Sequence, residues 1–242
     1  MAGMVSEPQV FYGDTWTNDA TQRHPLGTRA YTKDGRRFRY GSVGAADLVA
    51  GNLIQSAAPI ANHLANTPPT VAIGATSFSY TPGATAGAAN LYAEGYLQVD
   101  TTPGNGYTYQ VSGHAAITSA TAFTLRLLDA IQVALTGSSA VGLKHNLYKN
   151  VIQCPTTKTG PVVGFAPTII SASNYGWLHT WGIVSALING TPAVTAPVVN
   201  SATTAGAVDV WSAAAQPTSS LVGEMCQIGV STKNNFVFAK ID

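Results

Sequence analysis

Histidine is the residue type most able to perform acid–base or metal chemistry in this sequence, and its spacing favours neither. The five histidines are His24, His63, His114, His145 and His179. No two are four positions apart, so no helical face presents a pair of imidazole ligands. HExxH, P-loop and GxSxG motifs are also missing from the sequence, as is GxGxxG in a strand-to-helix setting. We therefore expect structural or surface roles for the histidines, with no metal site and no cofactor.

Paired carboxylates are the other route to hydrolysis, because a glycosidase needs two of them across one cleft. Beyond residue 66 the chain has only six acidic residues: Glu94, Asp100, Asp129, Asp209, Glu224 and Asp242. Each can equally serve a turn or solubility. We predict that the protein is not an enzyme, and a polysaccharide depolymerase is the enzymatic alternative.

The densest local charge lies around the sequence RAYTKDGRRFRYG, residues 29–41. Residues 23–39 hold six cations and one carboxylate, although the whole chain has a formal net charge of only +1. Arginine pairs with carboxylates through two parallel hydrogen bonds, so we interpret the segment as docking on an acidic groove of a protein partner. A merely solvated hairpin is one alternative. Nucleic-acid contact is another, but we expect no such partner, because one basic stripe on a near-neutral chain is weak support for it. The predicted contact residues are Arg29, Lys33, Arg36, Arg37, Phe38, Arg39 and Tyr40.

The centre of this segment, Asp34-Gly35, is a favoured two-residue hairpin turn, since both residues can adopt a positive φ. Such a turn places Tyr31 opposite Phe38 and Lys33 opposite Arg36. A ribbon this small is not stable alone, so it must lie on its own body or on another subunit.

An aromatic cluster, YGWLHTW, occupies residues 175–181. In an extended strand, Tyr175, Trp177, His179 and Trp181 would share one face. That face could pack into the core, form a subunit contact, or stack on glycans; tryptophan is common in interface hot spots. If it is a contact segment, its candidate residues are Tyr175, Trp177 and Trp181.

Composition points to a surface that faces other proteins. The 242 residues are 45% hydrophobic but only 10% charged, against about 25% charged in typical globular domains. No apolar run approaches the roughly 20 residues of a membrane-spanning helix, and the N-terminus lacks the order of a signal peptide. We expect no membrane association and no classical secretion.

Cys154 and Cys226 are interpreted as two buried thiols in a protein made in a reducing cytosol, with a single disulfide as the alternative.

The chain reads as three parts: residues 1–66, an N-terminal arm with the basic hairpin; 67–154, a β-rich domain; and 155–242, a C-terminal β-rich domain. Short alternating segments separated by Gly, Pro and Asn predict many short strands. We therefore predict an all-β fold, with a β-sandwich or barrel-like body, an extended N-terminal arm and one or two short helices. The best helix is Ala84 to Gly95, whereas residues 45–66 fit either a broken helix or an extended arm.

Several segments together resemble a known family. These are YTKDGRRFRYGSVGAADLVAGNLIQ, NLYAEGYLQVDTTPGNGYTYQV, YGWLHTWG, GAVDVW and FVFAKID. They resemble the head decoration, or capsid cement, proteins of tailed bacteriophages. The likeness runs through nearly the whole chain, and its motifs are turn and packing signatures.

The resemblance implies a β-rich virion protein, made in the host bacterial cytoplasm, on the outer capsid surface. Its expected function is to stabilise the expanded head by bridging subunits of the major capsid protein. It also implies self-association, with a homotrimer favoured and a dimer as the alternative. The alternative function is a glycan- or receptor-binding head fibre or adhesin module that uses the aromatic segment.

Overall fold

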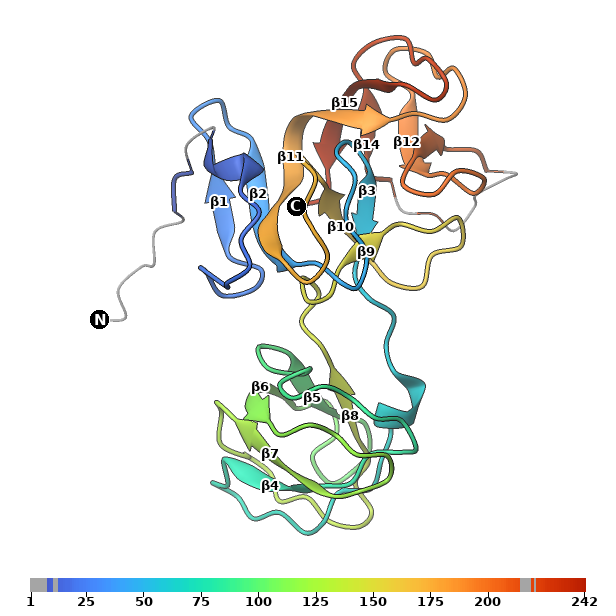
Figure 1. Cartoon of the computed structure of the whole chain (residues 1–242). Helices are drawn as coiled ribbons and strands as arrows, with labels where there is room; N and C mark the ends of the chain where they lie inside the picture. The colour runs from blue at the N-terminus through green and yellow to red at the C-terminus, as the bar shows by residue number, and fades with distance from the viewer. Residues whose placement is uncertain (1–7, 11–12, 214–218, 220) are drawn as a thin grey trace. The chain divides into compact units, whose positions relative to one another are not determined.

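The structure is a computed structural model and describes residues 8–10, 13–213, 219 and 221–242. The chain divides into two compact units (Figure 1). The first, here called the split unit, comprises Met1–Ala58 and Leu147–Asp242. The second, the inserted unit, comprises Pro59–Asn146.

The split unit is built on one large antiparallel sheet. Its main path has the order β13-β12-β14-β15-β11-β10-β3-β9, and β2 pairs with both β11 and β1. Its elements are the 3₁₀ turn η1 (Asp14–Trp16), β1 (Arg29–Tyr31), β2 (Arg37–Ser42), β3 (Leu53–Gln55), β9 (Ile152–Gln153), β10 (Val162–Phe165), β11 (Tyr175–Leu187), β12 (Pro197–Asn200), β13 (Val208–Val210), β14 (Gly223–Met225) and β15 (Asn234–Lys240).

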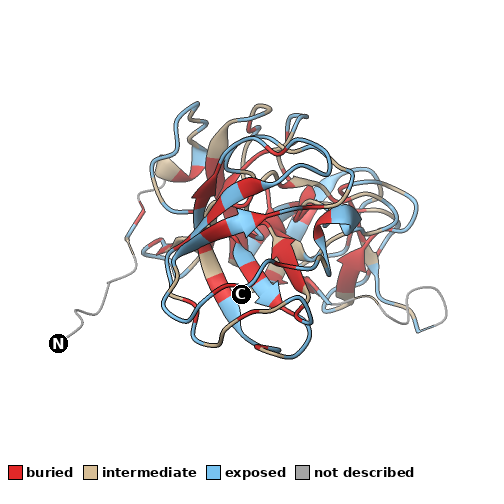
Figure 2. Ribbon diagram, turned by 90° about the horizontal axis from the view of Figure 1, so that it is seen from below, coloured by how far each residue is buried: buried red, intermediate tan, exposed pale blue. Residues whose placement is uncertain are grey.

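Strand β11 is the longest of these strands and organises the sheet. Its first half pairs with β2 and its second half with β15. A β-bulge between His179 and Trp181 separates the two halves, and Gly182 follows with a φ of +100°. The bulge bends the strand. Buried and exposed residues alternate along β15, so one face of this strand packs on the core while the other faces solvent. Figure 2 shows buried residues on the strands and exposed residues on many of the loops.

The inserted unit contains a second antiparallel sheet with the order β4-β7-β6-β5-β8. Its elements are the 3₁₀ turn η2 (Ala61–His63), β4 (Ser77–Tyr80), β5 (Tyr96–Val99), β6 (Thr108–His114), β7 (Phe123–Leu127) and β8 (Val141–Lys144). It has a hydrophobic core of its own, in which Tyr80, Tyr92, Leu97 and Leu125 are almost fully buried.

The prediction of an all-β fold with many short strands is confirmed, but the predicted helix at Ala84 to Gly95 is wrong. This segment forms turns, and Asn90 and Glu94 adopt positive φ values of 58° and 63°. Its backbone forms isolated turns, such as the bond from the Ala93 amide to the Asn90 carbonyl, and bonds to distant residues: Gly87 forms a bridge with Ile117, and the Asn90 amide donates to the His114 carbonyl. Long-range bonds therefore outweigh the local helix propensity of alanine.

The basic hairpin is confirmed, but its register differs by one residue from the prediction. Ala30 lies opposite Phe38 and Tyr31 opposite Arg37, because the loop has three residues rather than two. The Thr32 amide donates to the Arg36 carbonyl, and Gly35 closes the loop with a φ of 85°. The shift places Ala30 and Phe38 together in the core, and leaves Tyr31 exposed.

The two units differ from the three parts expected from the sequence. The predicted N-terminal arm is not separate, because β2 pairs along β11 of the third part. Residues 1–7 and 11–12 of that arm lie outside the described residues. The middle part agrees more closely with the inserted unit, which begins at Pro59 and ends at Asn146.

Both cysteines are free thiols. Cys154 is buried as expected, and burial raises the pKa of its thiol to about 11. The prediction that Cys226 is buried is wrong, since this residue is exposed directly after β14. In the part of the chain that the structure describes, no helix combines the length and apolar character needed to cross a membrane.

Candidate protein-contact site

The two segments that the sequence singled out lie side by side as strands β2 and β11 (Figure 1). Trp177 is opposite Tyr40, His179 is opposite Phe38, and Trp181 is opposite Arg37. Their spacing of more than 130 residues gave no indication of this pairing.

Three of the predicted contact residues form the core of this junction. Phe38, Tyr40 and Trp177 are at most 3% exposed. Phe38 stacks on His179 with ring centroids 4.6 Å apart, and Tyr40 meets Trp177 edge-on at 5.1 Å. Burial also raises the pKa of the Tyr40 hydroxyl. These three side chains hold the strands together and are not available to a partner, while Tyr175 at the start of β11 is only half-buried.

Two of the predicted arginines form intramolecular ion pairs with the same carboxylate, that of Asp242. Arg29 donates to Asp242 through Nε at 3.1 Å and Nη2 at 3.0 Å. Arg39 donates to the same carboxylate through Nε at 3.1 Å and Nη2 at 2.6 Å, and also reaches the Gly27 carbonyl at 2.9 Å. Although desolvation opposes it, hydrogen bonding to both arginines lowers the pKa of Asp242 to about 2. Arg29 and Arg39 therefore have a structural role.

The tip of the hairpin holds the next pair of charges. Arg36 Nε donates to Asp34 Oδ2 at 2.8 Å, and the Thr32 hydroxyl also donates to the Asp34 carboxylate. Although desolvation opposes it, these hydrogen bonds and the nearby Arg36 guanidinium lower the pKa of Asp34. Lys33 is exposed beside this pair.

Arg37 and Trp181 belong to a continuous row of side chains that crosses the solvent face of the sheet. The Arg37 guanidinium lies 5.4 Å from the centroid of the Trp181 ring, which meets the Phe238 ring edge-on at 5.5 Å. Lys240 Nζ lies 5.9 Å from the Phe238 centroid and 2.6 Å from Glu224 Oε1. We call these five residues the aromatic–cation strip.

The strip comes from four different strands, β2, β11, β15 and β14, brought together by strand register. Trp181 is opposite both Arg37 and Lys240, and Phe238 is opposite Glu224. Sequence reasoning missed Phe238, Lys240 and Glu224. The available signal was the alternation in NNFVFAK, in which the two phenylalanines share a face opposite to that of the buried Val237.

The strip presents aromatic and charged side chains together on one solvent-facing surface. Solvent faces of antiparallel sheets are normally polar, so a row of arginine, aromatic and lysine side chains is a candidate binding surface. Within the described residues, no three His, Cys, Asp or Glu side chains gather as metal ligands would. Elsewhere, Asp129 accepts a bond from the Gln110 amide and Asp209 accepts one from Asn189 Nδ2, which are local structural roles.

Comparisons were made with family models, with curated proteins and with solved structures. None of the three gives a match to this chain, so the resemblance to head decoration proteins stays a prediction.

Proposed function

We propose that the protein is a non-enzymatic virion protein. It decorates the outer surface of a phage capsid and stabilises the expanded head by bridging subunits of the major capsid protein. The aromatic–cation strip is the observation on which this proposal rests. Tryptophan and arginine are the residues most enriched in interface hot spots, and here they stack on one another at 5.4 Å on the solvent face of a rigid sheet.

The contact surface differs from the one first expected. Arg29 and Arg39 are bound to Asp242, and Phe38, Tyr40 and Trp177 lie in the core. Arg37 and Trp181 remain as contact residues, joined by Phe238 and Lys240. Because Lys240 is already paired with Glu224, Arg37 carries the net charge of the strip, and a partner surface of complementary potential around it would favour docking.

Stabilisation of the head would follow from mass action. A protein that binds the assembled, expanded lattice and not its dissociated subunits stabilises the lattice by its binding free energy. The binding free energy is gained at every site, so a standard interface of about 1,600 Å² per copy is sufficient to stabilise the whole lattice. Self-association, with a homotrimer favoured over a dimer, belongs to the same proposal.

The glycan-binding alternative relied on Trp177 and Trp181, and only Trp181 is accessible to a sugar. Trp177 is only 3% exposed and packs against Tyr40, so it has no free face for a sugar ring. Of the predicted aromatic segment, Trp181 and Tyr175 remain accessible in part.

The proposal can be tested by adding purified protein to expanded heads that lack it and measuring occupancy by co-sedimentation. We expect the double variant Arg37→Ala, Phe238→Ala to bind at least about 30-fold more weakly, because hot-spot truncations typically cost about 1–2 kcal/mol each. Occupancy equal to that of the unaltered protein would overturn the docking role of the strip.

A matched control is Trp16→Ala. Trp16 is an aromatic side chain of the same unit that is 63% exposed and lies outside the strip. We expect its loss to leave head occupancy unchanged. The melting temperature of each variant, followed by far-ultraviolet circular dichroism, shows whether the fold is intact, so a folding defect is distinguished from a lost contact.

A further inference from the structure

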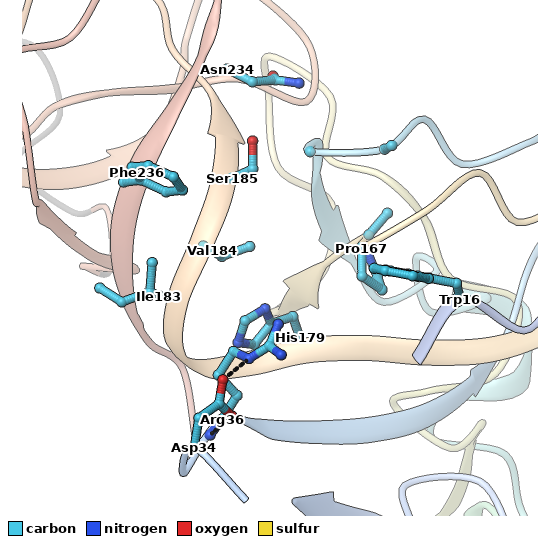
Figure 3. Close-up of a pocket in the computed structure, with 13 residues that line it drawn as sticks. Trp16, Asp34, Arg36, Pro167, His179, Ile183, Val184, Ser185, Asn234 and Phe236 are labelled. Atoms are coloured by element: carbon cyan, nitrogen blue, oxygen red, sulfur yellow. Dashed lines mark hydrogen bonds and ion pairs between the residues drawn. The ribbon is translucent and has the colours of Figure 1, made fainter. Parts of the chain in front are cut away.

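The split unit contains a pocket next to the strip, with a volume of about 440 Å³ (Figure 3). It lies over the second half of β11 and is bounded by the η1 turn, the hairpin tip and β15. The side chains that matter for its chemistry are Trp16, Asp34, Arg36, His179, Ser185 and Phe236, all of which line it.

Two exposed aromatic side chains form opposite walls. Trp16 on η1 is 63% exposed and Phe236 on β15 is 53% exposed, and Figure 3 places them on opposite sides of the pocket. Two large aromatic faces that are open to solvent and line the same cavity offer apolar surface to a ligand on both sides.

The polar groups of the pocket carry no net charge. Asp34 and Arg36 neutralise one another through their 2.8 Å ion pair. His179 is buried, its Nε2 lies 2.9 Å from the Trp181 carbonyl, and desolvation lowers its pKa to about 4, so the ring is neutral at physiological pH. Ser185 and Asn234 add exposed neutral groups at the far end.

We propose that this pocket binds a neutral pyranose sugar, with the ring held between Trp16 and Phe236 and its hydroxyls directed to Asp34, Arg36, Ser185 and Asn234. A pyranose has an apolar face of C–H groups and a rim of hydroxyls, which matches aromatic walls combined with paired donors and acceptors. The cavity volume falls within the range of about 300–1,000 Å³ usual for small-ligand sites and holds one or two rings.

Other small ligands fit less well. An anionic ligand would find its one arginine already neutralised by Asp34, and a cationic ligand would find the carboxylate engaged by Arg36 and Thr32. A purely apolar ligand would leave the charged pair without solvent, which is unfavourable.

The test is isothermal titration of the full chain with methyl glucoside, methyl galactoside, N-acetylglucosamine and the anionic N-acetylneuraminic acid. We expect saturable binding of at least one of the three neutral sugars. Substituting Phe236→Ala or Trp16→Ala should weaken it by about tenfold. Phe238→Ala, two residues along the same strand and outside the pocket, should leave it unchanged.

Several outcomes would overturn the proposal: no saturable binding of any neutral sugar by folded protein, binding of the anionic sugar alone, or equal losses in the Phe236 and Phe238 variants. Its failure is distinguishable from failure of the capsid proposal. Trp16→Ala impairs only sugar binding, whereas the Arg37→Ala, Phe238→Ala variant impairs only head binding.

Discussion

At the scale of single residues, the most consequential contact is the carboxylate of Asp242, which receives four hydrogen bonds from Arg29 and Arg39. Its side chain is only 13% exposed, so removing its charge weakens the hydrogen bonds that it accepts from both guanidinium groups. We expect Asp242→Asn to lower the free energy of unfolding of the split unit by about 2 kcal/mol.

Urea unfolding followed by tryptophan fluorescence measures this change, because all four tryptophans belong to the split unit. Glu224→Gln is the control, since its partner Lys240 is exposed and surface ion pairs contribute little. The folded pKa of Asp242, about 2, lies below its usual 3.8. Its contribution is therefore present above pH 4 and is lost as the pH falls toward 2. Equal stabilities of the Asp242 and Glu224 variants would contradict this role.

His179 titrates in a different window. Its folded pKa is about 4, below the ordinary 6.5, so between these values the unfolded chain binds a proton that the folded chain does not. Stability of the split unit should fall as the pH decreases from 6.5 to 4, by at most about 1.4 kcal/mol per pH unit. We expect His179→Gln to flatten this slope in urea titrations at several pH values. An unchanged slope would show that other groups are responsible.

At the scale of elements, the hairpin loop depends on a backbone conformation that only one of its residues adopts easily. Gly35 has a φ of 85°, and an added Cβ would meet no atom within 4 Å. A substitution there tests conformation alone. We expect Gly35→Ala to destabilise the split unit by about 1 kcal/mol, measured by thermal unfolding. Gly13→Ala, at a φ of −66° and equally open, should be neutral, and similar melting temperatures for both variants would contradict the argument.

The elements also show how far the sequence could be interpreted. Alternation and turn residues predicted β4, β5, β6, β7 and the hairpin, because those signals are local. Strands β3, β8 and β10 were missed: Leu53–Gln55 is buried at every position, and Val141–Lys144 and Val162–Phe165 contain a glycine and lack alternation. The strip was not predictable, because it depends on register among four strands that are far apart in the sequence.

At the scale of the whole molecule, one unit is inserted into the sequence of the other. Near the two points of insertion, each unit has backbone pairing that joins its incoming and outgoing segments. Gln55 pairs with Ile152 in the split unit, and Asn66 pairs with Val141 in the inserted unit. Composition does not change at residues 58 and 147 in a way that indicates this insertion, because both units are similarly rich in small polar residues.

This arrangement predicts that the inserted unit folds alone. We expect a fragment of residues 59–146 to give a dispersed amide NMR spectrum, because it has its own core and its own sheet. Amide proton signals confined to a narrow range of chemical shifts would show that the fragment needs the remainder of the chain to fold.

The central proposal, that the protein works by contact on a capsid, is tested most directly by electron cryomicroscopy of particles of a phage whose genome contains this sequence. We expect density for the chain repeated over the outer surface of the expanded head, with the Arg37, Trp181 and Phe238 side chains facing the major capsid protein. A head surface without this density, in particles that are otherwise complete, would contradict the account.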